Sequence, residues 1–264
     1  MLVEREFSTS YIYLDIAFLV FFVVMLIIKK KYLGLLFSLF GGILYFIVDY
    51  GIFHLALGSR AIENGDMFLT LLWMSISYGL TNFAIIYLFI SKDKDFLLYS
   101  LFIWIWWLVA PQINSIFDSG ANKIHISRTT GEYHGAMAIL LLVGYFGLII
   151  YNILIKDKNC KAPILKLFLI GFIVQFGWEL GLLLGGIRST SMDNLGDKLL
   201  LLLQNSLLET NLGMPYLWLI VLSLRRVITE ELKLVPKENR KTLKEEISLN
   251  NSIRYIELIK RSAC

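Results

Sequence analysis

The sequence predicts an all-α, polytopic membrane protein built as a bundle of seven transmembrane helices. Two observations support this fold class. The chain has 264 residues, of which 57% are hydrophobic and only 17% are charged, whereas about a quarter of the residues in a soluble domain are charged. Apolar runs of at least 18 residues also recur along the chain, and a run of this length is typical of a helix that crosses a bilayer.

The apolar runs define the organisation of the chain. We expect spans at residues 11–28, 33–57, 67–90, 96–117, 133–155, 164–187 and 199–224. Residues 1–226 then form a seven-helix transmembrane domain. Residues 227–264 form a tail that mixes Lys, Arg and Glu with spaced Leu and Ile.

The basic residues predict the orientation of the bundle. Lysines and arginines follow the first, third, fifth and seventh spans, and Lys29, Lys30 and Lys31 are the first such group. Cytoplasmic loops carry an excess of Lys and Arg. The N-terminus is therefore expected outside and the C-terminus inside. We expect a multi-pass protein of the cytoplasmic membrane, in contact with the lipid bilayer and with no nucleic acid.

Three carboxylates interrupt the apolar spans at one depth. Glu209 lies roughly 15 Å below the outer end of the seventh span, at 1.5 Å per helical residue. Glu179 and Asp49 lie roughly 12 Å below the outer ends of the sixth and second spans on the same measure. Ionisable groups inside a membrane are costly and commonly functional, so Asp49, Glu179 and Glu209 are the candidate catalytic residues.

Further polar and aromatic side chains lie in the same outer half of the spans. Tyr78 and Asn82 share a face with Ser75, and Gln175 and Asn205 each stand one turn before a candidate acid. The predicted substrate-binding residues are His54, Tyr78, Asn82, Gln175, Trp178, Asn205, Asn211 and Arg188. The arginines Arg60, Arg128 and Arg188 are expected at the outer edge only, which leaves the acids without a deep cation.

Small residues and a proline predict how two of the helices pack. Gly177, Gly181 and Gly185 recur every four residues and favour close packing against a neighbouring helix. Pro215 cannot donate a hydrogen bond to the carbonyl of Asn211. That free carbonyl beside Glu209 is expected to line a polar cavity, although a tolerated kink is the alternative.

The predicted chemistry is acid/base catalysis by buried carboxyl groups on an amphiphilic, lipid-like or isoprenoid-like substrate. The pocket is expected to face outward, because the inner halves of the spans are almost purely apolar. Two alternatives stay open: a small-solute or proton-coupled transporter or receptor, and a structural or accessory membrane protein. We expect no cofactor and no metal, since the spacing of the three histidines matches no metal motif.

The layout of the predicted bundle resembles that of the integral-membrane terpene cyclases. The resemblance rests on seven helices with short loops, an acid late in the second span and another in the seventh. It implies that Asp49 and Glu209 hold the places of the acids in that family. There, an acid protonates an epoxide or alkene of an isoprenoid dissolved in the membrane.

Overall fold

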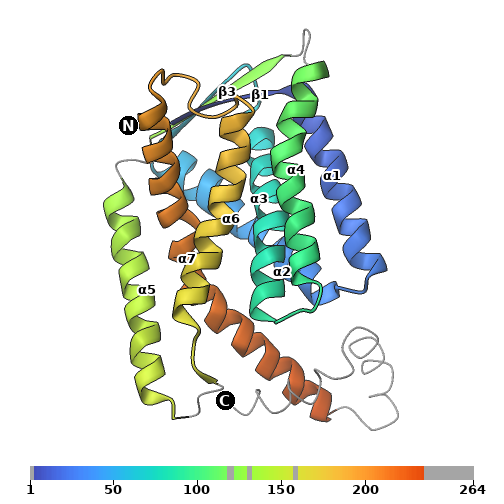
Figure 1. Cartoon of the computed structure of the whole chain (residues 1–264), viewed down its shortest axis with the longest axis vertical. Helices are drawn as coiled ribbons and strands as arrows, with labels where there is room; N and C mark the ends of the chain where they lie inside the picture. Colours follow the sequence, from blue (N-terminus) through green and yellow to red (C-terminus); the bar gives the residue numbers. More distant parts are fainter. Residues whose placement is uncertain (1–2, 118–121, 130–132, 157–159, 235–264) are drawn as a thin grey trace.

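The computed structural model describes residues 3–117, 122–129, 133–156 and 160–234, with side chains described up to residue 224 (Figure 1). Seven helices are long and apolar enough to cross a membrane. They comprise α1 Thr9–Ile28, α2 Tyr32–Phe46 with its continuation η1 Ile47–Ala56, α3 Met67–Ile90, α4 Phe96–Phe117, α5 His134–Leu154, α6 Ile164–Leu184 and α7 Leu195–Leu234. The expected helices are all present.

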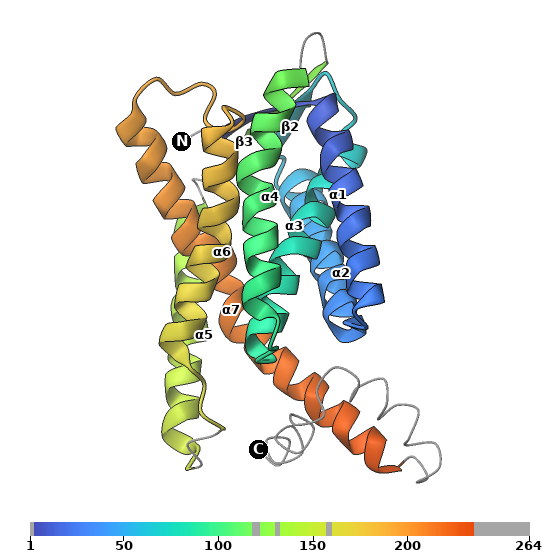
Figure 2. The ribbon, with the colours of Figure 1, turned by 45° about the vertical axis from the view of Figure 1, so that its right-hand side comes forward.

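The helices form a bundle with α3 at its centre and α5 at its edge (Figures 1 and 2). Almost every residue of α3 from Thr70 to Ile90 is buried. In contrast, α5 buries only Gly144 and Leu148 and leaves Ile153 75% exposed. An outer surface of large exposed aliphatic side chains favours contact with lipid, because soluble proteins rarely expose continuous apolar patches of that size.

A three-stranded antiparallel sheet covers one end of the bundle, which we call the sheet end (Figures 1 and 2). Its strands are β1 Val3–Ser8, β2 Arg60–Glu63 and β3 Lys123–Arg128, in the order β1-β3-β2. The expectation of an all-α chain was therefore incomplete. The strands come from the N-terminus and two loops, and each is only four to six residues long.

Alternation along the strands gives the sheet two different faces. Phe7, Ile124 and Ile126 are buried on the face toward the helices. On the other face, Glu6 pairs with Lys123 at 2.6 Å and lies 3.3 Å from His125. Successive side chains of a strand point to opposite faces, so the sheet seals the bundle with one face and meets solvent with the other.

The second span changes its helical geometry halfway. Residues Ile47–Ala56 form η1, a π-helix, which is wider than an α-helix and rare at this length. Within η1 only Asp49 is buried, while Ile47, Ile52 and Leu55 are exposed on the outer surface. The segment thus turns one carboxylate inward and an apolar surface outward.

The predicted glycine face of α6 packs against α4. A methyl group on Gly181 would overlap the backbone of Trp107, and one on Gly185 would overlap the ring of Pro111. Gly177 lies in the same way against the indole of Trp104. The glycines let the two helices approach closely, as the four-residue repeat predicts.

Gly79 marks the closest approach in the bundle, between α3 and α2. A methyl group there would overlap the backbone of Gly42. We expect Gly79→Ala to lower the free energy of unfolding by about 1–3 kcal/mol, because the two helices must move apart. Thermal unfolding in detergent measures this loss.

The matched control is Gly147→Ala in α5, where no atom lies within 4 Å of the added group. Because alanine favours a helix interior over glycine, Gly147→Ala should leave the unfolding midpoint unchanged or raise it slightly. Equal midpoints for the Gly79→Ala and Gly147→Ala proteins would argue against the close α2–α3 contact.

The last helix extends beyond the predicted span. It runs unbroken through Pro215 to Leu234, so the predicted boundary at residue 226 falls inside α7. The rest of the predicted tail, residues 235–264, lies outside the described residues. The Pro215 ring contacts the Cα region of Gly144 on α5, which gives this proline a packing contact.

Candidate functional site

Four arginines lie side by side on the inner face of the sheet, and we call them the arginine row: Arg188, Arg5, Arg128 and Arg60. Arg5 stands opposite Arg188, which follows α6 and forms an antiparallel bridge with β1. Arg128 stands opposite Arg60 on the neighbouring strand. Arg5 pairs with Ile126, two residues from Arg128, so these two arginines are diagonal neighbours. All four are at most 7% exposed.

Glu179 binds the first opposed pair of the arginine row. The Nη2 group of Arg5 donates to Oε1 of Glu179 at 2.7 Å, and Nη1 of Arg188 pairs with Oε2. Burial, together with the charge of Arg5, lowers the pKa of Arg188 to about 9. Arg188 therefore stays charged at neutral pH, and Glu179 separates two cations that would otherwise repel each other.

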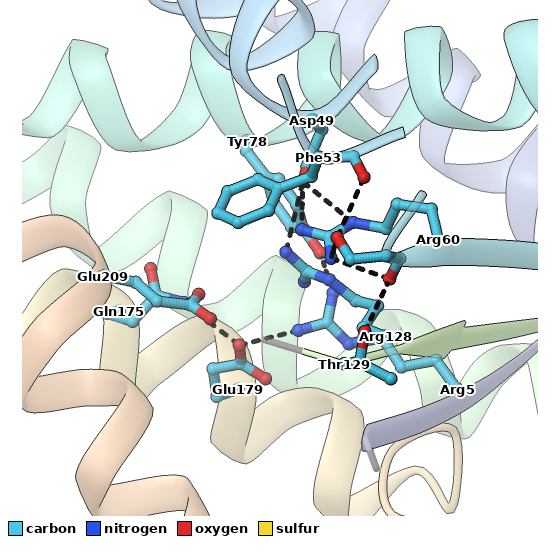
Figure 3. Close-up of polar contacts among 11 residues, drawn as sticks. Arg5, Asp49, Phe53, Arg60, Tyr78, Arg128, Thr129, Gln175, Glu179 and Glu209 are labelled. Atoms are coloured by element: carbon cyan, nitrogen blue, oxygen red, sulfur yellow. Dashed lines mark hydrogen bonds and ion pairs between the residues drawn. The ribbon is translucent and has the colours of Figure 1, made fainter. Parts of the chain in front are cut away.

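Asp49 binds the second opposed pair. Its Oδ1 atom accepts from Arg60 Nη2 at 2.7 Å and from Arg128 Nη2 at 3.3 Å. The Arg60 guanidinium also lies over the ring of Phe53, 4.4 Å from its centroid. Burial and the charge of Arg128 lower the pKa of Arg60 to about 10. Each opposed pair of arginines thus shares one carboxylate (Figure 3).

Glu209 joins the cluster through an amide rather than through an arginine. The Gln175 side-chain nitrogen donates to Oε2 of Glu209 at 2.7 Å and to Oε1 of Glu179 at 3.0 Å. Thr210 donates to the Gln175 oxygen at 2.6 Å, which fixes the orientation of the amide. Among the described residues, no cation lies within 4.0 Å of the half-buried Glu209 carboxylate.

The three candidate acids therefore lie in one cluster (Figure 3), but the expectation that they lack deep cations was wrong. Arg60, Arg128 and Arg188 do not stop at the edge of the bundle, and Arg5 was not considered. The physical reason is the sheet, which directs alternate side chains inward. The signal was present in the alternation of Arg5 with Phe7 and of Arg128 with Ile126 and Ile124.

Aromatic side chains lie beside the arginine row. The Tyr78 hydroxyl accepts a hydrogen bond from Nη1 of Arg5. The Trp178 ring meets the Tyr78 ring edge to face at 4.8 Å and the Trp107 ring at 5.9 Å. Tyr78 and Trp178, both predicted to bind substrate, thus lie at the ion-paired cluster.

The other predicted binding residues differ in their surroundings. Asn82 and Asn205 are buried, and neither amide oxygen has a hydrogen-bond partner in the described part of the chain. His54 is half-buried, with its ring 5.4 Å from that of Tyr50. Asn211 lies between helices, where its side chain contacts the Tyr145 hydroxyl at 3.2 Å and Gly171 of α6. Asn211 therefore has a packing role.

A fourth acid, Asp15 on α1, lies in separate surroundings. It is completely buried and accepts hydrogen bonds from the indole nitrogens of Trp73 at 3.0 Å and Trp106 at 3.2 Å. Both indoles come from other helices, α3 and α4. These contacts tie α1 to its neighbours and satisfy both carboxylate oxygens.

Comparisons with known proteins place no constraint on the function of this cluster. No family model, no curated protein and no solved structure matches the chain. The resemblance to the membrane terpene cyclases thus stays an expectation from layout. No group of three His, Cys, Asp or Glu side chains that could hold a metal ion occurs among the described residues.

The cluster divides chemically into two parts. Asp49 and Glu179 are each held by two arginines, and such pairing favours the charged carboxylate and works against proton donation. Glu209 is held only by an amide, so its carboxyl group can exchange a proton without breaking an ion pair. Acid/base chemistry at this cluster therefore falls to Glu209, and the arginines are suited to binding an anionic or polar group.

Proposed function

We propose that the chain is a membrane protein with its N-terminus and sheet end outside and its C-terminus in the cytoplasm. The seven apolar helices support the insertion, and the lysines that follow α1, α3 and α5 support the orientation. The cytoplasmic membrane is the membrane that this orientation describes. The arginine row then lies just beneath the outer surface.

We further propose that the protein is an enzyme that acts on an amphiphilic, lipid-like substrate. The observation that carries the proposal is the division of the cluster, in which Glu209 alone of the three acids makes no ion pair with a described cation. Glu209 is the proton donor or acceptor. Gln175 positions it, and the arginine row and Tyr78 bind the polar end of the substrate.

The surface of η1 supports a lateral approach from the bilayer. Gly51 is half-buried, and no atom lies within 4 Å of the position that its Cβ would take. Asp49, two residues earlier, faces the arginine row. An amphiphile lying along η1 would place its polar end near the cluster and its chain against exposed Ile52 and Leu55.

A structural role is the second candidate, and one observation favours it. Each strand contributes one arginine to an ion pair with a helix: Arg5 with Glu179, and Arg60 and Arg128 with Asp49. Such contacts also hold the sheet on the bundle. A transport path has less support, because α2, α3, α5, α6 and α7 meet away from the sheet in a packed apolar cluster around Phe83, Leu167 and Trp218.

Lipid conversion by the purified protein distinguishes these candidates. The wild-type protein is reconstituted with a total lipid extract from cells that carry its gene, and mass spectrometry follows the lipids over time. We expect one lipid species to fall and a product to rise. The Glu209→Gln protein should be slower by about 10²–10⁴-fold, the usual contribution of a general acid or base.

The control is Glu63→Gln, which removes an exposed carboxylate of β2. This variant should convert the lipid at the wild-type rate. Equal rates for the wild-type and Glu209→Gln proteins would contradict the assignment of Glu209. The absence of any lipid change with the wild-type protein would favour the structural candidate.

A further inference from the structure

The arginine row carries more positive charge than its carboxylates neutralise. Four guanidinium groups face three carboxylates: Asp49, Glu179 and Glu209. One positive charge is left over in a buried place. Buried charges are normally paired, so the cluster is one negative charge short.

Hydrogen-bond donors in the row are left over as well. The Nε groups of Arg5, Arg128 and Arg188 and the Nη2 group of Arg188 have no partner in the described part of the chain. These three side chains are at least nine-tenths buried. A buried N–H group without an acceptor is costly, and its presence in a folded protein indicates a missing ion or water.

The unpaired donors occur where the two carboxylates do not reach. Glu179 serves the opposed pair Arg188 and Arg5, and Asp49 serves the opposed pair Arg128 and Arg60. The diagonal neighbours Arg5 and Arg128 share no carboxylate that contacts both, and their side chains lie next to each other in the close-up (Figure 3). The free Nε group of each belongs to this central stretch.

We propose that the centre of the arginine row, between Arg5, Arg128 and Arg188, binds a phosphate group. Phosphate offers several strong acceptor oxygens and at least one negative charge, which match the leftover donors and the leftover charge. Guanidinium groups bind phosphate through paired hydrogen bonds. The inference rests on the proposed function and specifies it, since it makes the polar end of the amphiphile a phosphate ester.

A phosphate group could come from a lipid head group or from free phosphate, and two probes separate these sources. The full chain in uncharged maltoside micelles is titrated with dodecyl phosphate and with inorganic phosphate, and ³¹P NMR measures the affinity. Tighter binding of dodecyl phosphate indicates a lipid head group. Equal affinities indicate free phosphate. No binding of either probe overturns the proposal.

Arg188→Lys tests whether the row is the binding site. Lysine keeps the positive charge but removes the Nε and Nη2 donors, so affinity should fall at least about tenfold. Lys123→Gln removes a cation from the opposite, solvent-facing side of the sheet, where Lys123 is 53% exposed, and should leave the affinity unchanged. Unchanged affinity in Arg188→Lys would overturn the proposal.

A second variant covers the case in which Arg188→Lys does not fold. Arg128→Lys removes the Nε donor at the other side of the centre, and the same loss of affinity is expected. Glu209→Gln separates this inference from the proposed function, because Glu209 contacts Gln175 and no arginine. This variant should bind phosphate as the wild type does while losing turnover. Turnover that depends on Glu209 without any phosphate binding would overturn the phosphate site alone.

Discussion

The Glu179→Gln protein is expected to lose about 3–5 kcal/mol of its free energy of unfolding, the usual effect of removing one partner from a buried ion pair. Glu179 is fully buried and is the only described carboxylate that binds Arg5 and Arg188. The neutral amide would leave these two opposed, buried guanidinium groups without a counter-charge. Thermal or denaturant unfolding in detergent measures the loss.

The double variant Glu179→Gln with Arg188→Gln is the control for this interpretation. Removing one of the two cations should restore part of the lost stability, because less uncompensated charge stays buried. A double variant as unstable as the sum of its single variants would show that Glu179 and Arg188 do not interact. The ion pair would then not explain the effect of Glu179→Gln.

The Asp49→Asn protein is expected to be destabilised by a similar amount, about 3–5 kcal/mol. Arg60 and Arg128 stand directly opposite each other on neighbouring strands, an arrangement that is unfavourable for like charges. Asp49 is the carboxylate that binds both. Without it, the repulsion acts between β2 and β3, so hydrogen exchange of the β2 amides should increase together with the loss of stability.

Asp66→Asn provides the comparison. Asp66 is exposed and caps α3 through a hydrogen bond of 2.7 Å to the Leu69 amide. Asparagine caps a helix about as well as aspartate, so this variant should unfold at nearly the wild-type midpoint. A loss as large in Asp66→Asn as in Asp49→Asn would mean that the buried ion pairs contribute little.

The sequence was sufficient to predict the helices and the depth of the acids. Both follow from local patterns: long apolar runs, a rise of 1.5 Å per residue, and loops with lysines that indicate the orientation. The close packing of Gly177, Gly181 and Gly185 on α4 is confirmed for the same reason. A four-residue repeat of small residues describes one face of a single helix.

The arginine row could not be predicted in the same way, because it depends on pairing between distant segments. Arg5, Arg60, Arg128 and Arg188 are separated by long stretches of chain, and the register of three strands brings them together. Alternation in β1 and β3 was visible in the sequence. The pairing partners were not, because short strands flanked by long helices carry no local signal of register.

The distinction between Glu209 and the two ion-paired acids is the central claim, and unfolding of two variants side by side tests it most directly. The account predicts that Glu209→Gln unfolds at the wild-type midpoint, because the lost contact is a single hydrogen bond to Gln175, while Glu179→Gln unfolds at a much lower temperature. Equal losses in the two proteins would contradict the account. They would show that Glu209 is as much a part of the structural ion-pair network as Glu179.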